Sequence, residues 1–312
     1  MENEIEVYHL TKDYGYGRGI FDVSFSVKKG EVFGFLGPNG AGKSTTIRHL
    51  LGFSKPDSGL CEIFGKKTFD EYFNILKHVG YIPGEIALPQ GLTGYEFLKM
   101  IQDLQGFYNK VMLNKLLNMF ELDDASLKGD TKHMSLGVKR KLAIVAAFMS
   151  DPDVLILDEP TSGLDPVMQE VFVNFIKEEK EKGKTILLSS HIFSEIDSTC
   201  DRIAIIKDGK IVSEFVADDL KHAEVKRYQL FFENGEFLSK FLENEKSSEK
   251  MKILDFSKKD YSALISINDK DINYLISSLN NYSLVRFTNI KETLEDYFMK
   301  FYKEDKEFGG VK

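Results

Sequence analysis

The chain contains 312 residues, which is enough for one large domain and a smaller one. Its 41 Lys and Arg residues against 49 Asp and Glu residues give a net charge of −8, which disfavours a nucleic-acid-binding domain because such domains are more often basic. No uninterrupted apolar stretch approaches the roughly 18–20 residues needed to span a bilayer, and the N-terminal residues lack the basic and apolar regions of a signal peptide.

The first elements are expected to be short strands followed by a glycine-rich loop. Alternating apolar and polar residues such as 21–27 give residues 5–36 a half-buried antiparallel pattern. The apolar run 31–36 then leads into Gly-Pro-Asn-Gly-Ala-Gly-Lys-Ser-Thr at residues 37–45, and an amphipathic run follows at 46–51. A strand, a glycine loop and a helix in this order are the context of a phosphate-binding P-loop, which an ordinary glycine turn lacks.

This loop predicts a site for a nucleoside triphosphate. Its glycines let backbone N–H groups converge on an anion, and the helix that follows adds free amides and the positive end of its dipole. We expect Lys43 to reach the β- and γ-phosphates and the Ser44 hydroxyl to bind Mg²⁺. The predicted nucleotide-binding residues of the loop are Gly37, Pro38, Asn39, Gly40, Ala41, Gly42, Lys43, Ser44 and Thr45.

A helical region is predicted from about residue 84 to residue 150. Its helices are expected at residues 95–105, 111–120 and 135–149. Ser135 has the character of an N-cap for the last of them, ahead of a basic first turn and a strongly apolar helix. The Ser135 hydroxyl and the Gly137 amide at this positive helix end form a candidate second anion site, although the segment taken alone is only a capped helix.

Two apolar strands follow, and each ends in groups that suit phosphate chemistry. Residues 154–159 read Val-Leu-Ile-Leu-Asp-Glu, and a run that is apolar on both faces suits a central parallel strand with ligands at its carboxyl end. We expect Asp158 to hold the Mg²⁺ shell and Glu159 to polarise the attacking water. The second strand, 185–191, ends at His191, whose neutral imidazole can donate a hydrogen bond to the γ-phosphate. A lone histidine after a strand more often serves packing, but this one closes a core strand beside the nucleotide strands.

The character of the sequence changes after about Lys221. Residues 154–216 alternate strands and helices and close with a hairpin at Asp208-Gly209. Beyond them we expect strands at 228–232, 252–256, 261–267 and 283–287, and helices at 235–242, 271–279 and 291–302. The order β-α-β-β-α-β with an added helix is the ferredoxin-like pattern. The predicted division is a nucleotide-binding domain at 1–220, with its helical subdomain at about 84–150, and an accessory α+β domain at 221–312.

Taken together, residues 3–220 resemble the ATP-binding subunit of ABC transporters, with the motifs in family order and at family-like spacing. The matching segments are the Walker A loop 37–44, the signature loop 134–138, the Walker B strand 154–159, the D-loop 162–165, the switch His191 and the adenine-stacking Tyr14. The resemblance implies an α/β P-loop NTPase fold with a mixed sheet core, an antiparallel β-subdomain and the inserted helical subdomain. It also implies that ATP and Mg²⁺ are bound, and it adds Tyr14 and Asp165 to the nucleotide contacts.

The resemblance also implies partners. The chain carries a single Walker A loop, and in the family the signature loop completes the site of a second subunit, head to tail. Two chains, identical or different, are expected to hold each ATP between the P-loop of one and Ser135 and Gly137 of the other. Hydrolysis removes the bridging γ-phosphate, and the opening of the dimer drives a separate integral-membrane permease. The chain is then expected to be cytoplasmic and peripheral on the inner face of the cell membrane, with no nucleic-acid partner.

Two segments depart from the family pattern. The family signature is Leu-Ser-Gly-Gly-Gln, whereas Met134, Leu136 and Val138 replace its leucine, first glycine and glutamine here. Gly84 stands where the Q-loop glutamine is expected, with Glu85 next to it as a candidate substitute. Such variants are similar to the drug- and antibiotic-export branch of the family.

The leading interpretation is an ATPase that powers export of a drug, peptide antibiotic or lipid. The alternative is a soluble ABC ATPase that acts on ribosomes or DNA, but relatives of those kinds usually carry two cassettes on one chain, long coiled coils or zinc cysteines. A regulatory ATP-binding module with little turnover is a third interpretation. Glu159 and His191 argue against it, whereas Gly84 and Leu136 leave it open.

Overall fold

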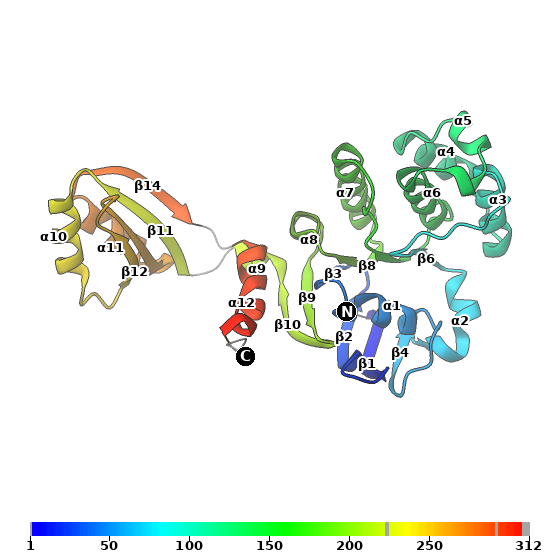
Figure 1. Cartoon of the computed structure of the whole chain (residues 1–312), viewed down its shortest axis with the longest axis horizontal. Coiled ribbons are helices and arrows are strands. Elements are labelled where there is room, and N and C mark those ends of the chain that lie inside the picture. The colour runs from blue at the N-terminus through cyan, green and yellow to red at the C-terminus, as the bar shows by residue number, and fades with distance from the viewer. Residues whose placement is uncertain (1, 222–224, 291–292, 308–312) are drawn as a thin grey trace. The chain divides into compact units, whose positions relative to one another are not determined.

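The computed structural model describes residues 2–221, 225–290 and 293–307, and the chain forms two compact units, Met1–Ala217 and Asp218–Lys312 (Figure 1). The first unit contains two sheets and the second contains one, and each unit has its own hydrophobic core. Among the described residues, no helix is both long enough and apolar enough to cross a membrane.

A six-stranded sheet forms the centre of the first unit, with the strand order β10-β9-β3-β8-β7-β6. Its strands are β3 (Val32–Leu36), β6 (Val79–Ile82), β7 (Val154–Asp158), β8 (Thr185–Ser190), β9 (Arg202–Lys207) and β10 (Lys210–Val216). All neighbouring pairs are parallel except β9 and β10, which form the predicted hairpin. Strands β3, β7 and β8 are buried along their whole length, as strands covered on both faces must be. Their carboxyl ends therefore meet at one edge of the sheet.

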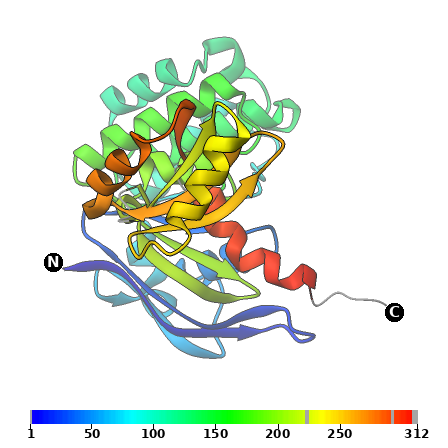
Figure 2. The ribbon, with the colours of Figure 1, turned by 90° about the vertical axis from the view of Figure 1, so that its left-hand side faces the viewer.

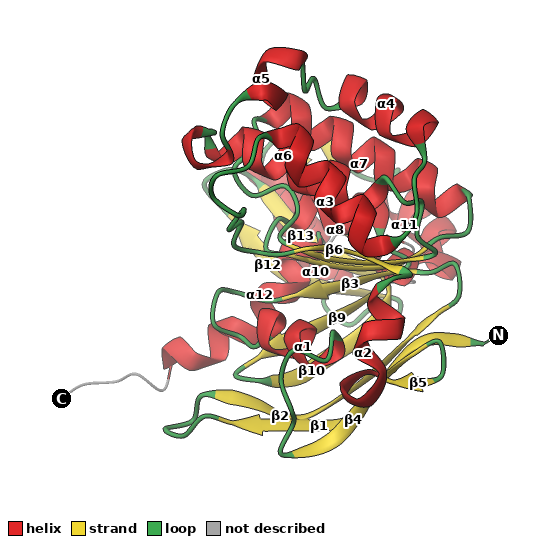
Figure 3. Cartoon of the chain, turned by 90° about the vertical axis from the view of Figure 1, so that its right-hand side faces the viewer, coloured by secondary structure: helices red, strands yellow, loops and turns green. Residues whose placement is uncertain are grey.

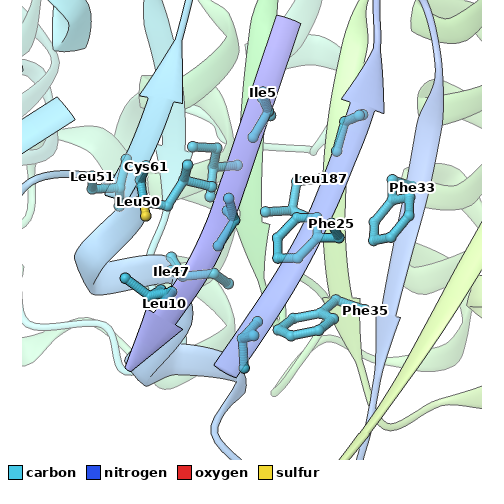
Figure 4. Close-up of a cluster of buried hydrophobic side chains, with 14 of the residues drawn as sticks. Ile5, Leu10, Phe25, Phe33, Phe35, Ile47, Leu50, Leu51, Cys61 and Leu187 are labelled. Carbon is cyan, nitrogen blue, oxygen red and sulfur yellow. The ribbon is translucent and has the colours of Figure 1, made fainter. Parts of the chain in front are cut away.

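A smaller antiparallel sheet lies on one side of this layer, with the strand order β2-β1-β4-β5. Its strands are β1 (Asn3–Asp13), β2 (Gly19–Lys28), β4 (Ser58–Ile63) and β5 (Lys66–Lys67). Helix α1 (Lys43–Leu50) contributes Ile47 and Leu50 to the same core as both sheets (Figure 4). In that core the rings of Phe25 and Phe33, one from each sheet, stack with their centres 5.2 Å apart. This packing fixes the glycine loop that joins β3 to α1.

Helices cover the opposite face of the six-stranded sheet (Figure 3). They include α3 (Gly94–Gln105), α4 (Lys110–Met119), α5 (Asp124–Lys128), α6 (Leu136–Phe148), α7 (Pro166–Glu181) and α8 (Phe193–Thr199). The three helices predicted between residues 84 and 150 are confirmed as α3, α4 and α6, to within one residue at each end. Helix α2 (Thr68–Leu76) was not predicted from the sequence. Its aromatic residues Phe69, Tyr72 and Phe73 are exposed, so its apolar residues do not mark one buried helix face.

The second unit is a four-stranded sheet with the strand order β12-β13-β11-β14, and its three pairings are antiparallel. After α9 (Ala217–Lys221), its elements are β11 (Val225–Phe232), α10 (Gly235–Glu245), β12 (Met251–Ser257), β13 (Ser262–Asn268), α11 (Ile272–Leu279), β14 (Leu284–Ile290) and α12 (Leu294–Glu307). Helices α10 and α11 lie on one face of the sheet (Figure 2), and their Phe241 and Leu275 join its core. Each predicted strand and helix overlaps an observed one. The predicted last helix begins with residues 291 and 292, which lie outside the described residues.

Candidate functional site

Three side chains from separate segments meet where strands β3, β7 and β8 end. Nζ of Lys43 donates to the carbonyl oxygens of Gly37 at 2.6 Å and Pro38 at 3.3 Å, and forms an ion pair with Oε1 of Glu159 at 3.1 Å. The other carboxylate oxygen of Glu159, Oε2, lies 2.5 Å from Nδ1 of His191. Lys43 and Glu159 are largely buried, so the ammonium and the carboxylate attract each other with little screening by water.

The loop before α1 leaves its backbone amides open to an anion. Gly42, the N-cap of α1, has φ of 114°, and a Cβ there would lie 2.8 Å from Cγ2 of Ile20, so this position requires glycine. No described side chain caps α1, and its first turn carries no acidic residue. A cavity of about 160 Å³ opens above the loop, and its lining residues are Pro38, Asn39, Gly40, Gly42, Lys43, Ser44, Thr45 and Glu159. Gly37 and Ala41 complete the loop from beneath, where a Cβ on Gly37 would lie 3.2 Å from that of Ala41.

Asp158 is almost fully buried at the end of β7. The hydroxyl of Ser189 in β8 donates to its Oδ1 at 2.5 Å. The other oxygen, Oδ2, faces Gly84, where a Cβ would lie 3.0 Å from it. Gly84 therefore lies closer to the carboxylate than a residue with a side chain could without displacing it, while the neighbouring Glu85 is exposed.

Ser135 and Gly137 lie at the start of α6 and are not among the residues that line the loop cavity. The hydroxyl of Ser135 accepts a hydrogen bond from the Val138 amide at 3.3 Å, which confirms the predicted N-cap. Leu136, between them, packs over Gly163, since a Cβ on that glycine would lie 2.9 Å from Cδ2 of Leu136. The leucine thus joins the turn at the start of α6 to the turn that follows Glu159.

The two remaining predicted contacts also lie outside the cavity lining. Tyr14 follows β1, is half exposed, and has Nζ of Lys12 at 5.9 Å from its ring centre. Asp165 caps α7 and accepts a hydrogen bond from the Met168 amide at 3.0 Å.

Two buried charged residues beside the site were not predicted, namely Arg140 in α6 and Glu195 in α8. Glu195 accepts hydrogen bonds from the hydroxyls of Thr161 and Ser190, and so it joins the turn after Glu159 to the residue that precedes His191. Burial raises the pKa of Glu195, although the two hydroxyls oppose that change. Arg140 is the middle residue of the basic run 139–141, and nothing in that run distinguishes it from its two lysine neighbours.

The arrangement suits phosphoryl chemistry on a triphosphate. Free helix amides and an ammonium can bind phosphate oxygens, and a carboxylate fixed by an imidazole can orient a water molecule. Ser44 and Asp158 supply hydroxyl and carboxylate oxygens of the kind that Mg²⁺ prefers.

Comparison with known proteins agrees with this chemistry. The ABC transporter family matches residues 20–162. The bacitracin transport ATP-binding protein BcrA of Bacillus licheniformis is 35% identical over 310 residues, which cover 96% of this chain and 97% of that protein. A solved ATP-binding subunit of an ABC transporter superposes with a TM-score of 0.63 at 34% identity, over 70% of this chain and 92% of that one. The dimeric post-hydrolysis state of the ATP-binding cassette MJ0796, bound to ADP and Pi, gives a TM-score of 0.60 at 25% identity, over 68% of this chain and 98% of that one.

Proposed function

The chain belongs to the ABC transporter family as an ATP-binding subunit and is an ATPase, and we propose that it powers export of a drug, peptide antibiotic or lipid through a separate permease. The observation that carries the export proposal is the similarity to a bacitracin transport ATP-binding protein along nearly the whole of both chains. That similarity extends through the second unit, which lies beyond the matched family segment.

Hydrolysis is assigned to Glu159. We propose that the triphosphate binds to the loop amides. Its phosphate oxygens then replace the Glu159 carboxylate as the partner of the Lys43 ammonium, because both compete for the same cation. His191 then remains as the partner of Glu159 and holds the carboxylate toward the attacking water. Phosphoryl transfer depends mainly on positioning and on charge stabilisation, which these residues can supply.

Mg²⁺ is proposed as the accompanying ion. The Ser44 hydroxyl and the Asp158 carboxylate are the residues that would hold it, and the hydrogen bond from Ser189 orients the carboxylate. When bound, the ion neutralises charge on the β- and γ-phosphate oxygens.

The active form is proposed to be a head-to-tail dimer, of identical or different chains. The exposed Ser135 and the partly exposed Gly137 offer donors at a helix N-terminus but do not line the cavity of their own chain, so a second chain is proposed to supply the phosphate that they contact. The dimeric state of the similar MJ0796 cassette supports this arrangement.

The permease is proposed to dock on exposed aromatic residues near α2. Phe69, Tyr72 and Phe73 are exposed on this helix, and Gly52, next to the exposed Phe53, packs so closely on it that a Cβ would lie 2.7 Å from Cβ of Tyr72. Exposed apolar patches of this kind mark interaction sites. Docking there would hold the chain at the cytoplasmic face of the cell membrane.

The second unit is proposed to be an accessory domain of ferredoxin-like fold, with the division near residue 220. The order β11-α10-β12-β13-α11-β14 and the antiparallel pairings support this assignment. It contributes none of the residues proposed for phosphate chemistry.

Co-expression with a candidate permease, sought as a polytopic membrane protein among the neighbouring open reading frames, tests the export proposal. In a host sensitive to peptide antibiotics, the pair is expected to raise the inhibitory concentration, and Glu159→Gln is expected to abolish that protection. Glu170→Gln, the same change at an exposed position of α7, is the matched control. Protection that persists in Glu159→Gln would contradict ATP-driven export.

A further inference from the structure

Arg140 lies inside α6 and is almost fully buried, with 2% of its surface exposed. Each nitrogen of its guanidinium group donates to a main-chain carbonyl: Nε to Ser162 at 2.9 Å, Nη1 to Pro83 at 2.8 Å and Nη2 to Gly84 at 2.7 Å. A buried cation is costly unless its donors are satisfied. Here carbonyls from two separate loops satisfy them.

The first of these loops packs against the carboxylate of Asp158. Pro83 and Gly84 follow β6, and Gly84 lies so close to Asp158 that a Cβ would be 3.0 Å from Oδ2. Because the guanidinium group holds both loop carbonyls, it fixes how closely this loop approaches the carboxylate.

The second loop carries Glu159. The amide of Ser162 donates to the Glu159 carbonyl at 3.2 Å, while the Ser162 carbonyl accepts from Arg140. Glu159 itself has φ of 49°, a conformation that costs energy for a residue with a side chain and persists only where surrounding contacts maintain it. Burial lowers the pKa of Arg140, and the nearby charges of Asp158 and Glu159 oppose that change. The cation therefore complements both acids.

The helix that carries Arg140 begins at the Ser135 cap. Both residues belong to one continuous helix, so a movement of its N-terminus is transmitted to the guanidinium group and to the two loops it holds.

We propose that Arg140 is a positioning residue for ATP hydrolysis, which connects the N-terminus of α6 to the two loops that hold Asp158 and Glu159. The inference rests on the proposed function, in which the start of α6 contacts the ATP bound by the partner chain. Closure of the partner's site on α6 then sets the geometry of the two acids in this chain's own site.

Two substitutions test the proposal. Arg140→Lys keeps the charge, but its single nitrogen cannot reproduce the planar fork in which three separate nitrogens each meet a different carbonyl, and Arg140→Gln removes the charge as well. We expect both to lower kcat about tenfold to 100-fold, the scale on which a misplacement of about 1 Å acts, while KM and the dissociation constant of a fluorescent ATP analogue change less than about twofold. Lys141→Gln, at the next position of the helix, is the control and is expected to keep the wild-type kcat.

A double-mutant cycle separates positioning from general stability. Gly84→Ala places a methyl group against Oδ2 of Asp158 and so acts on the same carboxylate. Independent substitutions lower kcat by the product of their separate fold losses. If Arg140 acts through Gly84, the fold loss in kcat of the double variant is smaller than that product. Unchanged kcat in both Arg140 variants, or independent effects, would overturn the inference. If Arg140→Gln does not fold, the kcat of Arg140→Lys and its coupling with Gly84→Ala test the inference in the same way. Wild-type turnover in Glu159→Gln would instead overturn the proposed function, so the two failures are distinct.

Discussion

The carboxylate of Glu159 lies against the imidazole of His191, with Oε2 2.5 Å from Nδ1. Its other oxygen lies 3.1 Å from Nζ of Lys43. The two partners serve different purposes, because the lysine is expected to move to the phosphates when the triphosphate binds, whereas the histidine stays with the carboxylate. We therefore expect the orientation of Glu159 during hydrolysis to depend on His191.

We expect His191→Ala to lower kcat by about 100-fold or more, which is the size of contribution that a correctly placed general base makes. ATP affinity should change far less, since the loop amides and Lys43 are untouched. Phosphate release and titration with a fluorescent ATP analogue measure the two quantities. His78→Ala, at an exposed position, is the control. A kcat within twofold of wild type in His191→Ala would contradict the orienting role.

Ser135→Arg is expected to abolish hydrolysis and leave ATP binding to the single chain intact. Ser135 is exposed at the start of α6, so a long cation there blocks closure on the partner's ATP without touching the chain's own loop. Mixing this variant with Lys43→Ala gives dimers with one site in which an intact P-loop faces an intact Ser135. If the two sites act independently, part of the activity returns on mixing; if both sites must close, as the role proposed for Arg140 implies, none returns. Normal turnover by Ser135→Arg alone would contradict the shared site.

We expect the free energy of unfolding to depend on pH through the buried carboxyl group of Glu195. Burial raises its pKa above the ordinary value of 4.5, so the folded chain binds this proton more tightly than the unfolded chain does. The contribution of Glu195 to the free energy of unfolding therefore falls as pH rises from the unfolded pKa through the raised folded pKa. Glu195→Gln cannot ionise and lacks this loss. The stability of the variant relative to wild type, measured by urea unfolding, should increase between about pH 5 and about pH 8. If the variant and the wild type differ in unfolding free energy by the same amount at both pH values, the pKa of Glu195 is not raised in the folded chain.

A fragment of residues 1–221 is expected to bind ATP as tightly as the full chain. It keeps both sheets of the first unit and every residue proposed to contact phosphate. Titration with a fluorescent ATP analogue and thermal melting, with the full chain as control, measure the outcome. An insoluble fragment, or a soluble one that does not bind, would show that the second unit is needed for the first to fold or function.

The sequence predicted the features that depend on neighbouring residues alone. The strand 154–159 and the capped start of α6 are such cases, because a run of apolar residues or a serine before a helix reports on its own neighbourhood. Contacts between distant segments left no local pattern. Arg140 binds the carbonyl of Gly84, and Leu136 packs over Gly163, yet nothing near either residue in the sequence points to its partner.

Turnover by Glu159→Gln is the decisive measurement for the proposed catalytic site. The amide keeps the shape of the carboxylate but cannot act as a base, so ATP binding should persist while turnover falls by about 100-fold or more. Size-exclusion chromatography with ATP and Mg²⁺ should then show an ATP-bound dimer, and Glu170→Gln should behave as wild type. A Glu159→Gln chain that hydrolyses ATP at the wild-type rate would contradict the assignment of the site.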